Sequence, residues 1–418
     1  MKSQKNDMII ILLSNYPYVG GEHFVNNEIL ELSKKENDIY ICPLYPDNDT
    51  LQYEVPANVK ILKLNKGRKS LKYLTRGFFS TILDADFWTD IAACVKSRKS
   101  PKAILASIYY FNQINSAYFQ IRGWIRRKKV QGDSITFYSY WMHTHACIAA
   151  KLKKENAGSF FVTRCHGYDL YEDRSSSGYL PGRKLIFEQA DYILPISNQG
   201  KQYLCSTYRI QHKNRIEVCY LGTFEQGKNP YSPNLIRIVS CSNLVPLKRV
   251  EVIIDALSML QFENIEWIHF GGGALLEKIK AKAQILLNTK VKFDFRGAVD
   301  NAEIMKYYRE NSITLFVNAS QYEGLPVSIM EAMSFGIPAV ATDVGGTKEI
   351  VKNDFNGYLV DKNLSPEVLA EKIEKYVKLS EDQKKAFRAN ARDTWQQFFD
   401  ASVNYEKFYY MALNNIGI

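Results

Sequence analysis

Short apolar runs, separated by segments with helical spacing, recur along the N-terminal half of the chain. Met8–Leu13 is wholly apolar and ends at turn-forming residues, as expected of a buried parallel strand. Residues 24–33 have the spacing of an amphipathic helix, and Ile39–Pro43 has the pattern of a second strand. Further strands are expected at 134–140, 159–165 and 192–196. This β-loop-α-β alternation predicts a doubly wound α/β domain.

A second alternation of the same kind follows a stretch rich in Gly, Pro, Asn and Ser at 222–234, which has the composition of a linker. Its strands are expected at 236–241, 266–270, 291–295, 312–317, 338–342 and 357–360, and its helices at 249–260, 274–286, 302–309 and 326–335. The tail from 365 to 413 has a helical pattern. The sequence therefore predicts a first domain at 1–222, a second at 236–394, and a C-terminal helix at 395–418 that crosses back to the first.

Residues 64–130 interrupt the alternation, because apolar and basic residues interleave there and predict several amphipathic helices. Between 63 and 130 the chain has 15 Lys and Arg residues and three acidic ones, whereas the net charge of the whole chain is +10. The segment is a solvated surface, a nucleic-acid site or a docking surface for an anionic membrane. We favour the membrane and expect no nucleic acid, since no recognition motif accompanies the charge.

Composition indicates a globular protein rather than a disordered or membrane-spanning one, with 46% hydrophobic and 23% charged residues. The seven cysteines include no C-x-x-C pair, so neither a zinc ribbon nor a disulfide framework is expected. The apolar run at 8–13 is too short for a signal peptide, and no run approaches the roughly 18 residues of a membrane span. We expect a cytoplasmic protein, peripheral on the inner face of the cell membrane.

The most informative motif is a pair of glutamates, Glu323 and Glu331, on either side of a predicted helix start. Pro326 suits the first helical position, where its missing N–H costs nothing. The free N–H groups of Val327 and Ser328 would then form an anion site at the positive end of the helix.

Two carboxylates beside a phosphate site restrict the choice of ligand. Carboxylates accept hydrogen bonds from hydroxyl groups, so a ligand with hydroxyls on both sides of a diphosphate fits this arrangement. A nucleotide sugar has that chemistry. Gly336 suits the C-terminal stop of the same helix.

The spacing Glu323-x7-Glu331 resembles the E-x7-E motif of the retaining glycosyltransferases of family 4, which have the GT-B fold. Other blocks are similar to segments of that family and stand in its order, at 20–22, 165–169, 242–248, 270–273, 295–299, 345–346 and 357–360. The resemblance covers nearly the whole chain apart from 64–130. It implies two Rossmann-like domains that face each other across a cleft, with the donor in the C-terminal half and the acceptor in the N-terminal half.

The resemblance also implies roles for the residues that match the donor motifs. Glu331 would hold the ribose hydroxyls, and Glu323 would hold hydroxyls of the transferred sugar. Lys248 would neutralise the diphosphate, and the backbone of Val299 would contact the base. The remaining predicted donor residues are Gly324, Leu325, Val327 and Ser328.

On the acceptor side the resemblance implies Gly20, Gly21, Glu22 and Asp169, with His166 lining the reaction centre beside Glu323. It further implies transfer of a hexose with retention of configuration, without metal or cofactor. The donor would be a UDP-sugar rather than a GDP-sugar, and the acceptor a glycan or lipid-linked glycan of a surface polysaccharide. No protein nucleophile is assigned.

One departure from the family pattern concerns the diphosphate. Asn243 stands where the family usually has an arginine, and Arg249 follows Lys248 where a glycine is common. A charge-assisted hydrogen bond is worth about 1.5–3 kcal/mol, so its loss would weaken donor binding about tenfold or more. Arg249 is the candidate replacement.

Several alternatives compete with these interpretations. Asp84-Ala-Asp86 matches the metal-diphosphate motif D-x-D of another glycosyltransferase fold, but it lies in the basic segment and is interpreted as chance. His143 and His145 would share a face on a strand, without a third ligand nearby in sequence. A nucleotide-sugar epimerase or glycan phosphorylase would use the same fold, and a non-catalytic membrane-associated scaffold protein is the alternative of another class.

Overall fold

The computed structural model describes residues 8–19, 22–46, 48–64, 71–130, 134–208, 210, 215–287 and 290–413. The chain divides into two compact units. The first comprises Met1–Cys219 together with Tyr405–Ile418, and the second comprises Tyr220–Asn404.

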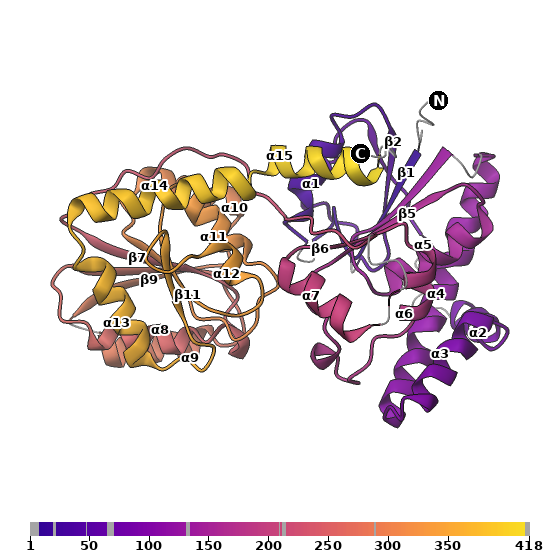
Figure 1. Ribbon diagram of the computed structural model, residues 1–418, viewed down its shortest axis with the longest axis horizontal. Helices are drawn as coiled ribbons and strands as arrows, with labels where there is room; N and C mark the ends of the chain where they lie inside the picture. Colours follow the sequence, from indigo (N-terminus) through magenta and orange to yellow (C-terminus); the bar gives the residue numbers. More distant parts are fainter. Residues whose placement is uncertain are drawn as a thin grey trace. The chain divides into compact units, whose positions relative to one another are not determined.

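The first unit contains a six-stranded parallel sheet in the order β3-β2-β1-β4-β5-β6 (Figure 1). Its strands are β1 (Met8–Leu13), β2 (Asp38–Pro43), β3 (Val59–Ile61), β4 (Ile135–Ser139), β5 (Phe160–Cys165) and β6 (Tyr192–Pro195). Every residue of β1 is buried, because the strand lies between β2 and β4 and is covered on both faces.

The helices of the first unit are α1 (Val25–Leu32), α2 (Leu71–Ile82), α3 (Ala85–Lys96), α4 (Pro101–Lys128), α5 (Thr144–Glu155), η2 (Glu172–Arg174), α6 (Arg183–Gln189) and α7 (Asn198–Thr207). Alternate residues of β1 enter two separate cores. Ile10 and Leu12 pack with the helices α4 and α5, whereas Ile9 and Ile11 pack with α1. The period of two that separates these sets is that of a strand buried on both faces.

The C-terminal segment completes the second of these cores. After α15 (Ala401–Phe408) the chain ends its described part in a π-helical turn, η5 (Tyr409–Leu413). Phe408 and Leu413 are fully buried in the core that contains Ile9 and Ile11. The guanidinium of Arg164, itself wholly buried on β5, lies 4.4 Å from the centre of the Phe408 ring.

The second unit contains another six-stranded parallel sheet, in the order β12-β11-β10-β7-β8-β9 (Figure 1). Its strands are β7 (Ile236–Cys241), β8 (Ile265–Phe270), β9 (Val291–Gly297), β10 (Leu315–Asn318), β11 (Ala339–Thr342) and β12 (Gly357–Val360). Its helices are η4 (Pro246–Lys248), α8 (Val250–Met259), α9 (Leu276–Leu287), α10 (Asn301–Glu310), α11 (Val327–Ser334), α12 (Thr347–Ile350), α13 (Pro366–Val377) and α14 (Glu381–Phe398). The chain is therefore α/β with two Rossmann-like sheets, as predicted.

The sequence pattern located the long elements and missed the short ones. Each predicted strand is present, and the expected amphipathic helices of 64–130 are α2, α3 and α4. β3 and α12, of three and four residues, had not been predicted. In the described ranges, no helix combines the length and the apolar character needed to span a bilayer.

Candidate functional site

Helix α11 starts one residue later than predicted. Pro326 is its N-cap, with an extended ψ of 100°, so Val327 rather than Pro326 occupies the first helical position. The carbonyl of Pro326 accepts from the N–H of Ile329, while the N–H groups of Val327 and Ser328 have no acceptor among the described residues. These are the two N–H groups that the sequence predicts to form an anion site.

The C-terminal end of α11 agrees with the prediction. Gly336 has φ of +74°, and its N–H donates to the carbonyl of Met333 over 2.9 Å. The N–H of Ile337 donates to the carbonyl of Ala332, which completes a Schellman cap. The helix that carries Glu331 is thus fixed at its end.

Glu323 lies in the loop between β10 and α11 and is bound by two donors. Its Oε1 accepts from Lys248 Nζ at 2.7 Å and from Asn318 Nδ2 at 3.3 Å. The side chains of Lys248 and Glu323 are 23% and 13% exposed, so the ion pair is partly shielded from water. Two residues 75 positions apart in sequence are therefore brought together, as the family resemblance implies.

Glu331 lies in the second turn of α11, and burial of its carboxyl group raises its pKa to about 7. Asn301 Nδ2 donates to its Oε1 at 2.7 Å and acts against that increase. Burial also raises the pKa of Cys241, at the end of β7, to about 12, with a further contribution from the charge of Glu331. Glu331 therefore changes charge near neutral pH.

In the loop between β7 and α8, the guanidinium of Arg249 is bound by backbone carbonyls. It donates to those of Ala319, Ser320 and Lys362 at 2.8–3.1 Å. Asn243 is exposed. Arg249 therefore ties this loop to the end of β10, and its contacts give no sign that it replaces the missing family arginine.

Glycines allow the loops at the carboxyl edge of the sheet to pack closely. A Cβ on Gly345 would lie 2.0 Å from the carbonyl oxygen of Glu323, and one on Gly271 would lie 1.9 Å from that of Ser242. Both glycines have positive φ, at +56° and +129°. Gly345 therefore allows the backbone after β11 to pack directly against the carbonyl of Glu323.

The other predicted donor residues follow the same strands. Val299 lies between β9 and α10, while Gly324 and the buried Leu325 lie between β10 and α11. In open α/β sheets, ligands bind outside the carboxyl ends of the strands. All of the predicted donor residues lie at that edge of the second sheet or at the start of α11.

In the first unit, Glu22 anchors the loop after β1. Its carboxylate accepts from the backbone N–H groups of Ser14, Asn15 and Tyr16 at 2.7–3.0 Å, and from Trp141 Nε1 at 2.5 Å. Four donors occupy the two oxygens, so the carboxylate holds the loop in place. Gly20 and Gly21 lie outside the described residues.

His166 and Asp169 lie together after β5. Asp169 accepts from the backbone N–H groups of His166 and Gly167 at 2.8 and 3.0 Å, and from that of Met142 at 2.9 Å. Burial alone would raise the pKa of Asp169, but the side chain and N–H of His166 together with the N–H of Met142 lower it. Asp169 therefore stays ionised and fixes the His166 loop.

The imidazole of His166 is enclosed by aromatic rings. Its centre lies 4.8 Å from that of Tyr140, with the planes nearly parallel, and 4.5 Å from that of Trp141. Within the described residues, neither ring nitrogen forms a hydrogen bond, and Nδ1 lies 3.6 Å from Asp169. Trp141 also donates to Glu22, so it joins the two predicted acceptor-side groups.

The alternative motifs occupy structural positions. Asp84 caps α3, and Lys151 binds Asp84 and Asp86 at 2.9 and 3.3 Å. His143 and His145 lie at the start of α5 and not on a strand, so the prediction of a shared strand face was wrong. Burial lowers the pKa of both histidines to about 3, and His145 Nε2 lies 3.2 Å from Ser14 Oγ.

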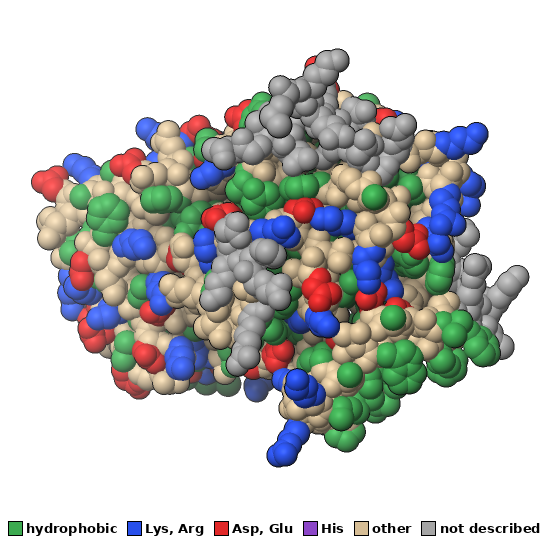
Figure 2. Space-filling view, turned by 45° about the vertical axis from the view of Figure 1, so that its right-hand side comes forward, with side chains coloured by type: hydrophobic (Ala, Val, Ile, Leu, Met, Phe, Trp, Pro, Cys, Tyr) green, Lys and Arg blue, Asp and Glu red, His purple; other side chains and the backbone are tan. Residues whose placement is uncertain are grey.

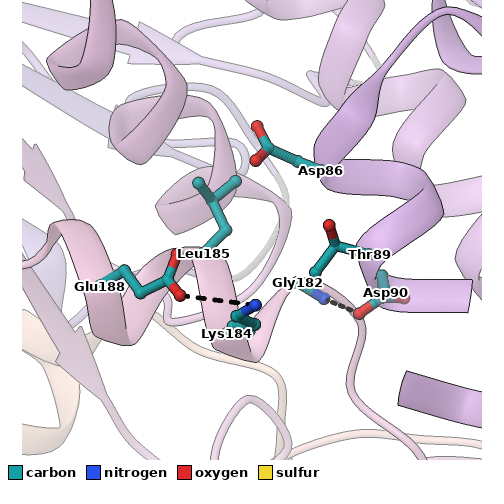
Figure 3. A pocket seen from close by; sticks show the side chains of 7 residues that line it. All are labelled: Asp86, Thr89, Asp90, Gly182, Lys184, Leu185 and Glu188. Atoms are coloured by element: carbon teal, nitrogen blue, oxygen red, sulfur yellow. Dashed lines mark hydrogen bonds and ion pairs between the residues drawn. The ribbon is translucent and has the colours of Figure 1, made fainter. Parts of the chain in front are cut away.

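A hollow of about 60 Å³ lies between α3 and α6 (Figure 3). Its lining includes Asp90, which accepts from the N–H of Gly182 at 2.8 Å, and the pair Lys184 and Glu188, whose charged atoms lie 3.7 Å apart. None of the predicted site residues lines it. Its volume suits a few water molecules rather than a nucleotide.

Three residues of the site were not anticipated: Trp141, Asn301 and Asn318. Each binds one of the predicted carboxylates through a side-chain nitrogen. Asn318 ends β10 and Asn301 starts α10, which are the positions where an α/β sheet places its ligands. The position of Asn301 and Asn318 at these ends was the signal available in the sequence. Asparagine as a residue type does not by itself indicate a binding site.

Comparison with known proteins locates a family match in the second unit. Residues 223–394 match the family described as "Glycosyl transferases group 1". The chain is 27% identical over 255 residues to a putative colanic acid biosynthesis glycosyltransferase, WcaL, of Salmonella typhimurium, which covers 57% of this chain and 60% of that protein. It is 33% identical over 153 residues to an Escherichia coli UDP-Gal:alpha-D-GlcNAc-diphosphoundecaprenol alpha-1,3-galactosyltransferase. This match covers 36% of this chain and 34% of that protein. The chain thus spans less than two thirds of the length of either relative.

Solved structures share the fold over the whole chain. The lipopolysaccharide outer core galactosyltransferase WaaB superposes with a TM-score of 0.69 at 17% identity, covering 97% of this chain and 100% of WaaB. HepE of Anabaena, solved with UDP, gives a TM-score of 0.64 at 16% identity. The superposition covers 96% of this chain and 98% of HepE. At this level of identity the likeness shows the GT-B architecture alone.

Proposed function

We propose that this chain, whose residues 223–394 belong to the group 1 glycosyl transferases, transfers a hexose from a nucleotide-diphosphate sugar to a glycan or lipid-linked glycan. The product would be part of a surface polysaccharide. The colanic acid assignment of WcaL and the lipid-linked acceptor in the name of the galactosyltransferase support this direction.

The ion pair between Lys248 and Glu323, next to the two free N–H groups at the start of α11, carries the proposal. Lys248 and these N–H groups supply positive charge for a diphosphate, and Glu323 supplies an acceptor for sugar hydroxyls. Glu331, in the next turn, would accept from the ribose. The charge for the leaving diphosphate comes from the protein, so we propose a reaction without metal or cofactor.

In the proposed reaction the bond from the anomeric carbon to the diphosphate oxygen breaks, and a bond to an acceptor hydroxyl oxygen forms on the same face. The hydroxyl proton passes to the departing phosphate, so the configuration is retained. His166, with both ring nitrogens unbonded among the described residues, would contact the sugar at this centre. Lys248 and the start of α11 stabilise the growing negative charge.

We propose UDP rather than GDP as the carrier, because the galactosyltransferase relative is named for UDP-Gal and HepE has been solved with UDP. A lipid-linked acceptor would place the enzyme peripherally on the inner face of the cell membrane. The predicted contact is the basic segment at 63–130.

Calorimetric titration with UDP, GDP, ADP and their sugars, in the presence of a chelator, tests the donor site. One nucleotide should bind in preference, and the variant Glu331→Ala should lose affinity for it. If no nucleotide binds, or if binding requires a metal, the proposed donor site is wrong. Product analysis with and without a lipid-linked acceptor then distinguishes transfer from epimerisation.

A further inference from the structure

Helices α2 and α3 expose several large apolar side chains. Gly77 and Thr81 of α2 are buried, whereas Phe79 and Leu83 at its end are 65% and 86% exposed. A Cβ on Gly77 would lie 2.0 Å from Asn112 Oδ1, so α2 packs on α4 through its small and polar residues. In the part of α2 whose side chains are described, the large apolar residues Phe78, Phe79 and Ile82 are exposed.

Helix α3 buries Phe87 and Cys94 together with the polar Asp90, and it exposes other large apolar residues. Asp90 is only 5% exposed and accepts from Ser107 Oγ, Tyr179 OH and the N–H of Gly182 at 2.6–2.8 Å. Trp88 and Val95, seven residues apart on one face of the helix, are 53% and 62% exposed. A surface helix in water normally keeps such large apolar side chains on its buried face.

The exposed apolar residues of the two helices are continuous. Trp88 Nε1 donates to the carbonyl of Ile82 at 2.7 Å, so the indole lies against the end of α2. Figure 2 shows hydrophobic side chains gathered over this part of the molecule, at the lower right. We call this surface the α2–α3 face; its exposed apolar members are Phe78, Phe79, Ile82, Leu83, Trp88 and Val95.

The charges around the α2–α3 face are of one sign. Between 77 and 109, the exposed charged residues are Lys96, Arg98 and Lys102. The acidic residues Asp84 and Asp86 are neutralised by Lys151 and Lys154 at 2.8–3.3 Å. The face thus combines aromatic and aliphatic groups with unpaired positive charge.

A groove of about 440 Å³ adjoins the face. Phe79 and Leu83 form one wall, and Tyr118 and Phe119 of α4 form another, with Lys151 among the polar residues that also line it. Its largely apolar lining suits a hydrocarbon chain.

We propose that the α2–α3 face docks on an anionic lipid bilayer, with Phe79, Leu83 and Trp88 inserted and Lys96, Arg98 and Lys102 against the headgroups. Aromatic and aliphatic residues enter the headgroup region, and each nearby cation strengthens binding to acidic lipid. The inference rests on the proposed function in that it names the membrane partner. Docking itself is measured without donor or acceptor.

Flotation with vesicles of phosphatidylglycerol and phosphatidylcholine tests the docking. The intact chain should float with anionic vesicles and remain in solution with pure phosphatidylcholine. The double variant F79S/L83D should lose binding. The matched control Ile285→Asp, at a residue of α9 that is 79% exposed, should bind normally. Replacing Lys96, Arg98 and Lys102 by Gln should lower the partition coefficient about 100-fold at low salt.

The fluorescence of Trp88 is a second measure of docking, and it is recorded on the chain with the rest of the α2–α3 face unchanged. This fluorescence should shift to the blue and be quenched by brominated lipid, and the variant Trp88→Phe should remove that response. The proposal is wrong if the chain does not bind anionic vesicles, or if Ile285→Asp loses binding to the same extent as F79S/L83D. It is also wrong if the only effect of F79S/L83D is to dissociate a dimer. A nucleotide titration of the same samples separates this failure from failure of the donor site.

Discussion

Asn301 donates to the carboxyl group of Glu331, whose pKa is raised to about 7 by burial. Ribose hydroxyls would bind the ionised form, so nucleotide affinity should rise about tenfold between pH 6 and pH 8. Calorimetry across this range measures the rise. Since nucleotide phosphates also titrate near pH 6, the variant Glu331→Gln is needed as the reference, and only the difference between the two profiles counts.

Ionisation of the Glu331 carboxyl group should raise nucleotide affinity but lower the free energy of unfolding. The pKa of this group in the folded state exceeds the ordinary value of 4.5, so the folded protein holds the proton more tightly than the unfolded chain. This contribution is fully present below about pH 4.5 and is lost as the pH rises through about 7. The stability of the parent chain, measured by urea unfolding, should therefore fall relative to that of Glu331→Gln between about pH 4.5 and 7, with a constant difference above that range. Curves that stay parallel from about pH 4.5 to 7 would contradict the assignment.

Glu323 should affect turnover more than nucleotide binding. The change Glu323→Gln removes the charge that pairs with Lys248 and weakens contacts to sugar hydroxyls, so kcat/KM should fall about 10–100-fold. UDP affinity should remain within a few-fold of the parent. Glu277→Gln is a suitable control, because Glu277 is 87% exposed on α9. A large loss of UDP affinity would assign Glu323 to the nucleotide instead.

Arg249 has φ of +47°, a conformation that L-residues adopt at a cost, and its guanidinium binds three carbonyls. Arg249→Gly relieves the backbone but removes these bonds, so we expect a net loss of about 1–3 kcal/mol in stability and little change in donor affinity. Asn243→Arg should instead raise UDP affinity about tenfold. Calorimetry and urea unfolding separate the two effects, and a large loss of affinity in Arg249→Gly would show that Arg249 does serve the phosphate.

At the scale of elements, the end of α11 depends on Gly336. A Cβ there would lie 3.1 Å from the carbonyl oxygen of Arg388, and φ is +74°. Gly336→Ala should lower the free energy of unfolding by about 1–2 kcal/mol, as measured in urea. Gly178→Ala is the matched control, because its φ is +63° and a Cβ meets nothing within 4 Å. Equal losses in both variants would mean that the contact with Arg388 adds nothing.

Sequence reasoning located the elements whose pattern is long and unambiguous. Apolar runs such as Met8–Leu13 have to be buried on both faces, and that requirement is visible in composition alone. β3 alternates Val, Lys and Ile over three residues, which is too short to distinguish from a loop. The start of α11 was misplaced by one residue, because proline suits both the N-cap and the first helical position in sequence.

The carboxylates of the candidate site were visible in sequence, whereas their partners were not. Glu323 and Glu331 have a recognisable spacing. Trp141, 119 positions from Glu22, donates to it only because β4 ends beside β1. The exposure of Phe79, Trp88 and Val95 was also hidden, since hydrophobic spacing alone does not reveal which apolar residues pack on a neighbouring helix.

At the scale of the whole molecule, the C-terminal segment belongs structurally to the first unit. Phe408 is fully buried beside Arg164, so Phe408→Ala should destabilise that unit by about 3–5 kcal/mol. Amide hydrogen exchange should show the loss in β1 and β5, with the strands of the second unit protected as before. Uniform loss of protection in both units would instead mean that they unfold together.

The late return of this segment also bears on how the protein is made. Ile9 and Ile11 are translated before the second unit, whereas Phe408 and Leu413, which share a core with them, are translated after it. On the ribosome, the part of this core that Phe408 and Leu413 complete therefore stays open while the whole second unit is synthesised. The first unit cannot complete its folding before the second has emerged, and a chain released early would present that open part of the core to chaperones and proteases.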